Sequence, residues 1–77
     1  MVRGKRDPAL GAAIRQARED AGLTQAQLAV RADLAIGTLT RLEAGTTDPS
    51  WSSVRALAEA LGVSLPVLGR LVEGDRR

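Results

Sequence analysis

Two short helices joined by a tight turn are predicted in the middle of the chain, and this pattern restricts the fold more than any other feature. The first helix starts at a capping box, in which Thr24 is followed three residues later by Gln27. The turn falls at Asp33, a residue type that tolerates a positive backbone φ better than most. The second helix is expected from about Ile36 to Ala44, with Gly45 as its C-cap. Helices this short need tertiary contacts, so the rest of the chain must pack around them.

Three further helices are predicted from start and stop signals on either side of this pair. Pro8 is favoured at the first position of a helix, and Gly22 ends that helix in a left-handed cap. Ser50 caps the next helix, which stops at Gly62, and Ser64 caps the last. Apolar residues recur at helical spacing, and no alternating strand pattern is found. The predicted fold class is therefore all-α, with five helices.

The chain is long enough for one small domain. Its 77 residues leave no room for a second core. Because it has no cysteine, the domain depends on closely packed helices or on dimerisation for stability. We predict a folded domain over residues 8–72, preceded by a basic arm at residues 1–7 and followed by a polar tail at residues 73–77.

The absence of His, Cys and Tyr excludes several kinds of functional site. Neither a Ser–His or Cys–His nucleophile pair nor a metal site with thiolate or imidazole ligands can be built. Glu19 and Asp20 are adjacent, and adjacent helix residues do not face one another, so they form no catalytic dyad. We therefore expect no enzyme, no catalytic residue, no metal site and no cofactor.

The apolar segments are too short for a membrane protein. No run approaches the ~20 apolar residues of a membrane span, and the charged start is not followed by the apolar region of a signal peptide. The lack of cysteine also fits a reducing compartment. We expect a cytoplasmic protein without membrane contact.

The basic residues are almost all arginine. The net charge is +2, and ten of the eleven cations are Arg. Arginine suits phosphate and guanine recognition, although a GC-rich genome explains the same bias. Arg15, Arg31 and Arg55 are interpreted as solvated charges on helix faces, and Trp51 as a core or helix-staple residue.

Several spaced sequence elements agree, in order, with one known family. They are Leu23-Thr24-Gln25-x-x-Leu28-Ala29, Leu39-x-x-Leu42-Glu43-x-Gly45, Pro49-Ser50 and Leu57-Ala58-x-x-Leu61-Gly62-Val63-Ser64. Over residues 10 to about 68 the chain resembles the Cro/CI-type helix-turn-helix family, also called the xenobiotic-response-element (XRE) type. The resemblance implies a lambda-repressor-like domain that binds double-stranded DNA, usually as a dimer on a two-fold operator. The second helix of the pair would enter the major groove.

The resemblance also implies which residues meet DNA. Gln25 would contact a phosphate and brace the recognition helix. The implied base-facing and backbone-facing positions are Ile36, Gly37, Thr38, Thr40, Arg41, Thr46 and Thr47. Arg18 and Glu43 match a pair that forms a buried ion pair in the family, which would tie the first helix to the end of the recognition helix.

The recognition helix departs from the family pattern at its start. Ala35 stands where a capping Ser or Thr is common, which forfeits about 1 kcal/mol. Ile36 offers only apolar contact, for example to a thymine methyl, and Gly37 only permits close approach. Direct readout then rests on Thr40 and Arg41, where the arginine either reads a guanine or holds a phosphate.

The last helix is more apolar than docking onto the core requires. We predict that it forms a homodimer contact, with the alternative that every residue in it belongs to the core. The predicted dimer residues are Leu65, Leu68, Leu71 and Val72.

The expected function is that of a sequence-specific, repressor-like transcription regulator, associated with the nucleoid through DNA and with no small-molecule ligand. Within it, the basic arm would be either a solvated tail or a segment that contacts DNA. The alternative function is a protein-interaction module that keeps this fold with weak or non-specific DNA binding. Steep salt dependence of binding would distinguish the first from the second.

Overall fold

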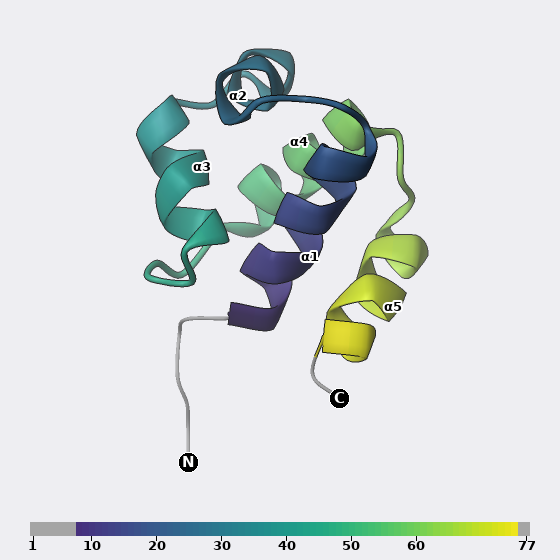
Figure 1. Cartoon of the computed structure of the whole chain (residues 1–77). Coiled ribbons are helices and arrows are strands. Elements are labelled where there is room, and N and C mark those ends of the chain that lie inside the picture. Colours follow the sequence, from purple (N-terminus) through teal and green to yellow (C-terminus); the bar gives the residue numbers. More distant parts are fainter. Residues whose placement is uncertain (1–7, 76–77) are drawn as a thin grey trace.

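Five helices follow one another through residues 8–75, the part of the chain that the computed structural model describes (Figure 1). They are α1 (Pro8–Asp20), α2 (Gln25–Ala32), α3 (Ile36–Glu43), α4 (Trp51–Leu61) and α5 (Leu65–Asp75). No β-strand occurs within this range, so the predicted all-α fold is confirmed. The predicted arm at residues 1–7 lies outside the described residues, as do residues 76 and 77.

The ends of α2 follow from local chemistry, as predicted. The Gln27 amide donates to Thr24 Oγ1 at 3.0 Å, and the Thr24 amide donates to Gln27 Oε1 at 2.9 Å. These two bonds satisfy amides that the first turn of a helix leaves without partners. At the other end, Asp33 is the C-cap and adopts the left-handed conformation, with φ 58°. The tight turn between α2 and α3 therefore depends on the residue that directly follows α2.

The predicted caps of the two C-terminal helices are also present. Ser50 Oγ accepts the amide of Ser53 at 3.1 Å at the start of α4. Ser64 Oγ accepts the amide of Val67 at 3.2 Å at the start of α5. Gly62 ends α4 with φ 73°. Each cap satisfies an amide or carbonyl group that the helix leaves open.

Two helix ends differ slightly from the prediction. The C-cap of α3 is Ala44, and Gly45 follows it in the left-handed conformation with φ 74°. At the C-terminus, α5 continues to Asp75, so the predicted tail contributes its first residues to the helix. Val72 is still packed against the core at this point, which favours continuation of the helix.

The core lies where α1, α2, α3, α4 and α5 converge. Four large side chains in it are completely buried: Ile14, Leu28, Leu39 and Leu57. In Figure 1, α5 runs alongside α1, and α2 crosses above the other helices. Among residues 8–75, no helix has the length and apolar character needed to cross a membrane. The core therefore forms by helix-on-helix packing, which leaves the outer face of α3 uncovered.

The burial of two residues, Trp51 and Leu68, distinguishes between alternatives that the sequence left open. Trp51 is 62% exposed and is not a core residue. It lies six residues before Leu57, which places it about 240° around α4 from the buried face. Leu68 is only 3% exposed and belongs to the core of its own chain. For Leu68 this burial agrees with the alternative that the residues of α5 belong to the core, and its role as a dimer contact stays a prediction.

Candidate nucleic-acid interface

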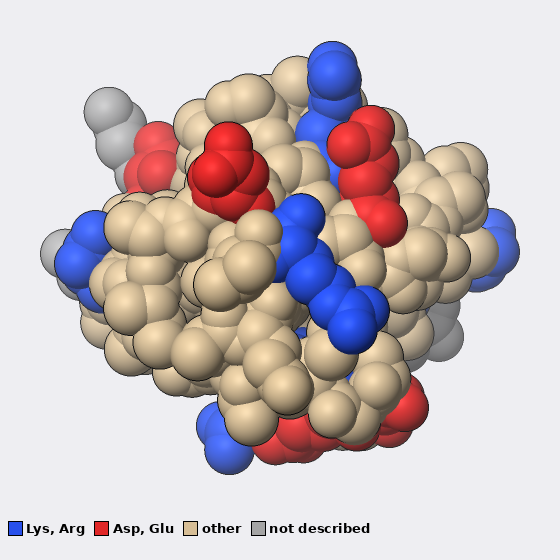
Figure 2. Space-filling view, turned by 90° about the horizontal axis from the view of Figure 1, so that it is seen from above, with Lys and Arg blue, Asp and Glu red and all other residues tan. Residues whose placement is uncertain are grey.

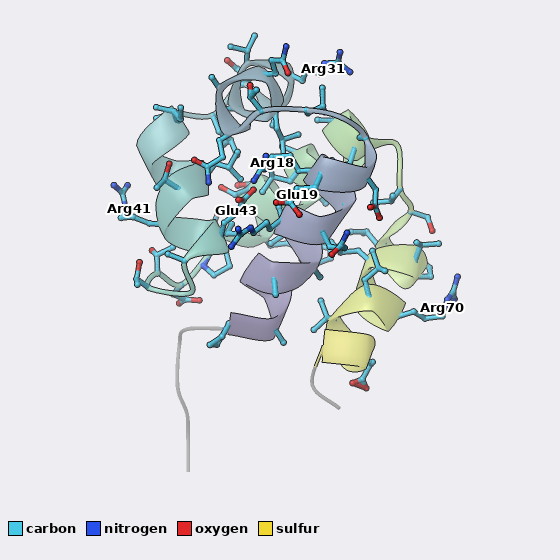
Figure 3. The ribbon with its side chains drawn as sticks, in the orientation of Figure 1. Arg18, Glu19, Arg31, Arg41, Glu43 and Arg70 are labelled. Atoms are coloured by element: carbon cyan, nitrogen blue, oxygen red, sulfur yellow. The ribbon has the colours of Figure 1, made fainter. Side chains whose placement is uncertain are left out.

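The outer face of α3 carries most of the predicted DNA-binding residues. Leu39 and Leu42 point into the core, so the helix presents its other residues outward. Ile36 is 51% exposed, and Thr40 and Arg41 are also exposed. In Figure 3, Arg41 points away from the body of the molecule on the side of α3. The remaining two predicted positions on this helix, residues 37 and 38, are half-buried.

Gln25, the first residue of α2, is hydrogen-bonded to two residues of α3. Its Nε2 donates to Glu43 Oε1 at 2.9 Å, and its Oε1 accepts the Thr40 hydroxyl at 3.2 Å. The same hydroxyl lies 2.9 Å from the Ile36 carbonyl, so its single hydrogen serves one of the two acceptors at a time. These contacts fix the orientation of the Gln25 amide and join the start of α2 to α3.

Arg18 and Glu43 meet as an ion pair between α1 and the end of α3 (Figure 3). Arg18 Nε donates to Glu43 Oε2 at 2.8 Å, and Nη2 donates to Oε1 at 3.1 Å. The remaining Nη1 donates to the Leu23 carbonyl at 2.8 Å. The two side chains are 12% and 3% exposed, respectively. This two-bond geometry holds the last turn of α3 against α1.

The hydrogen bond that Arg18 donates to Glu43 raises the pKa of Arg18 above its ordinary value, against an opposing effect of burial. A raised pKa stabilises the fold below the unfolded-state pKa, and the contribution is lost only as pH rises through the folded-state pKa. Since arginine already titrates above about pH 12, Arg18 remains charged throughout the physiological range.

The loop after α3 brings Thr46 back to the helix. Both its amide, at 3.1 Å, and its hydroxyl, at 3.2 Å, donate to the Arg41 carbonyl. The two bonds satisfy a carbonyl that the helix end leaves open. Thr46 is exposed and Thr47 is half-buried, so the loop continues the surface that α3 presents.

The start of α3 lacks a side-chain cap, as the sequence indicated. Ala35 is the N-cap residue and makes no side-chain hydrogen bond to the first turn. Two residues further on, Gly37 leaves room for Arg41: a Cβ at position 37 would lie 3.1 Å from Arg41 Nη1. Glycine at this position therefore lets the arginine guanidinium lie close to the helix backbone.

Charge is scattered on the face that Figure 2 shows, which looks down on α2. Arg side chains are separated there by Asp and Glu and by wide uncharged areas. On α3 itself, the cation is Arg41.

Sequence reasoning did not find two residues that shape this surface. Arg15 lines a polar depression together with Gln25, Thr40 and Glu43. The sequence signal for Arg15 was its position three residues before Arg18, because residues with this spacing lie on one face of a helix. Gly11 is buried where α1 meets the backbone of α3. A glycine inside a helix costs about 1 kcal/mol relative to alanine, and that cost is itself a signal of close packing.

Comparison with known proteins gives matches over most of the chain. The Helix-turn-helix domain family matches residues 9–71. The chain is similar to a crystal structure of the clp gene regulator ClgR from Corynebacterium glutamicum, with 32% identity, a TM-score of 0.87, and coverage of 92% of this chain and 91% of that chain. A second ClgR structure has 34% identity, a TM-score of 0.84, and coverage of 88% and 72%.

A more distant likeness supports the fold alone. The wild-type restriction-modification controller protein C.Esp1396I has 20% identity and a TM-score of 0.84, with coverage of 90% of this chain and 91% of that chain. No curated protein sequence matches the chain. The family match includes α2, the turn and α3, which carry the exposed polar face described above. The chain therefore belongs to the helix-turn-helix family of DNA-binding domains, of the Cro/CI or XRE type.

Proposed function

We propose that this protein is a sequence-specific, repressor-like transcription regulator that inserts α3 into the major groove of double-stranded DNA, in the cytoplasm. The observation that carries the proposal is the exposed outer face of α3, held in place from behind by Gln25 and by the Arg18–Glu43 pair. A recognition helix must be presented rigidly, because base contacts depend on distance and angle. These two braces provide that rigidity.

The residues of α3 have different proposed roles. Arg41 donates to guanine O6 and N7, and Thr40 contributes a hydroxyl beside it. Ile36 and Gly37 contact the DNA closely without hydrogen bonds, as with a thymine methyl, and Thr38 lies at the edge of this surface. This distribution predicts that base discrimination is concentrated at few positions.

The remaining proposed contacts go to the DNA backbone. Gln25 has a second amide hydrogen, beyond the one given to Glu43, for a phosphate. Thr46 and Thr47 lie in the loop that follows α3 and would approach the backbone on the other side of the groove. Such contacts fix the position of α3 on the duplex and carry no sequence information themselves.

Loss of Arg41 should remove defined base preferences. With random duplex DNA, selection on the wild-type protein should enrich a two-fold motif. The variant Arg41→Ala should bind the best site with about 1–3 kcal/mol less free energy, or roughly 5- to 150-fold more weakly, and should relax the motif at specific base pairs. Uniform weakening across all sequences would assign Arg41 to a phosphate.

The same selection tests the alternative function. A domain that binds DNA through several phosphates shows a steep fall of log affinity with log salt concentration. Failure to enrich any motif, with little salt-dependent binding, would instead favour a protein-interaction module. In that case the exposed apolar Ile36 would face a protein partner.

We also propose that two copies pair through α5. Leu65 and Leu71 are exposed on this helix, Val72 is half-buried, and Trp51 lies beside an apolar groove that Leu65 and Val72 also line. A second copy is the proposed occupant, because a two-fold operator requires two recognition helices. Pairing would remove these apolar side chains from water.

Dimerisation should be visible in the fluorescence of Trp51, the only tryptophan of the chain. Its emission should shift to the blue as protein concentration rises. Leu71→Glu should weaken self-association by at least about tenfold, because a buried, unpaired carboxylate is costly. Val30→Glu, at an exposed apolar residue of α2, is the control and should dimerise normally. A wild-type protein that sediments as one chain at all concentrations would contradict the proposal.

A further inference from the structure

A polar depression lies where α1 meets the start of α2 and the outer face of α3. Its lining residues are Arg15, Arg18, Gln25, Thr40, Glu43 and Ala44. Gln25 and Thr40 belong to the proposed DNA surface, so the depression borders the region that the DNA backbone would cross. Through Arg15, α1 thus brings a cation to this border.

The two arginines of the depression differ in how many of their guanidinium donors remain without an acceptor. The Nε, Nη1 and Nη2 atoms of Arg18 all donate to protein acceptors. Arg15 is 63% exposed, and its Nε lies 3.3 Å from Glu19. Within residues 8–75, no acceptor is found for the Nη groups of Arg15. Arg15 therefore keeps free the two parallel donors that match a pair of phosphate oxygens.

The cation of the depression that remains open to an anion is Arg15. Arg18 neutralises Glu43 within the lining, whereas the carboxylate that pairs with Arg15 lies outside the lining residues. Glu19, which is 49% exposed, is the acidic group nearest to Arg15. An exposed pair four residues apart on one helix is weak, so a phosphate can replace or share this contact.

We propose that Arg15 is a DNA-backbone contact that holds one phosphate at the mouth of this depression, with the free amide hydrogen of Gln25 as its neighbour. This inference rests on the proposed function and adds α1 to the DNA surface. It replaces the interpretation of Arg15 as a solvated charge. Arginine is suited to the role because its fork of donors binds two phosphate oxygens at once.

The test is the salt dependence of duplex binding by Arg15→Gln. Each phosphate contact contributes about 0.9 to the slope of log affinity against log salt. We expect the magnitude of this slope to fall by about 0.9 in the variant. If the variant and the wild type bind equally at 1 M salt, the variant then binds about eightfold more weakly at 0.1 M salt. The loss should be the same for every DNA sequence, because a phosphate contact carries no base information. Arg15→Lys should restore most of the slope.

Arg70→Gln is the matched control. Arg70 is exposed on α5 and points away from the molecule on the side opposite Arg41 (Figure 3). It carries the same charge, but at that distance salt screens its effect on DNA, so its slope should stay near that of the wild type. A slope for Arg15→Gln equal to that for Arg70→Gln would overturn the inference.

A second comparison uses Glu19→Gln. Removing this carboxylate should strengthen DNA binding, and the gain should shrink when Arg15 is also replaced by Gln, because the two side chains act through one contact. Equal gains in both backgrounds would overturn the proposed link. The wild-type protein separates the two proposals: if it binds no duplex DNA, the proposed function fails, whereas wild-type binding with an unchanged Arg15→Gln slope rejects only Arg15.

Discussion

Replacing Arg18 with alanine should destabilise the domain by about 3–5 kcal/mol. The change leaves the Glu43 carboxylate buried with Gln25 as its remaining side-chain partner, and breaking one side of a buried ion pair has this cost. For a domain of this size, a loss of about 3 kcal/mol lowers the melting temperature by at least about 12 °C. Thermal unfolding followed by circular dichroism measures the difference. Because the pKa of Arg18 is raised, its contribution should not change between about pH 6 and pH 9.

Arg15→Ala is the control for that measurement. It also removes an arginine of α1 that is paired with a glutamate, but this pair is exposed and should contribute less than about 1 kcal/mol. Arg18→Lys should recover part of the stability, since it restores the charge and not the two-bond geometry. Equal melting temperatures for Arg18→Ala and Arg15→Ala would mean that the buried pair does not hold α3 to α1.

Gly11→Ala should also unfold the domain at lower temperature, for a steric reason. A Cβ at this position would overlap the carbonyl oxygen of Leu42 and lie 3.0 Å from that of Glu43. Both atoms belong to the backbone of α3, so the clash is relieved only if α1 and α3 move apart. Overpacking of this kind costs about 1–3 kcal/mol, and a net loss of about 2 kcal/mol lowers the melting temperature by roughly 8–16 °C.

Gly69→Ala should instead raise the melting temperature in the same experiment. Gly69 lies inside α5, and a Cβ there meets no atom within 4 Å. Alanine should therefore stabilise this helix by about 0.5–1 kcal/mol. A Gly11→Ala variant that melted at a higher temperature than the wild type would contradict the close approach of α1 and α3.

The two destabilising substitutions affect one junction. Gly11 sets how closely α1 approaches the last turn of α3, and Arg18 fixes that turn through Glu43. The folded fraction of either variant should therefore bind DNA more weakly than the wild type, since the angle of α3 in the groove depends on this junction. The junction also explains why a glycine and a half-buried arginine lie on the same face of α1.

Some parts of this protein follow from the sequence alone. The capping box of Thr24, the left-handed turn at Asp33 and the serine caps of α4 and α5 depend on side chains that bond to backbone groups within a few residues. Because these hydrogen bonds join residues that are close in the sequence, the number of helices and nearly all their limits were predictable. The family resemblance added the Arg18–Glu43 pair, whose members are 25 residues apart.

Packing between helices decided the rest. Periodicity shows that α5 has apolar residues, but only its angle against α1 buries Leu68 and leaves Leu71 exposed. The same is true of Trp51, which lies off the buried face of α4. Likewise, Arg15 joins Gln25 and Thr40 only because α1 packs against α3. The sequence determined where each helix begins and ends, because hydrogen bonds near helix ends are local. Only the tertiary structure decided which faces meet, because burial depends on residues far apart in the chain.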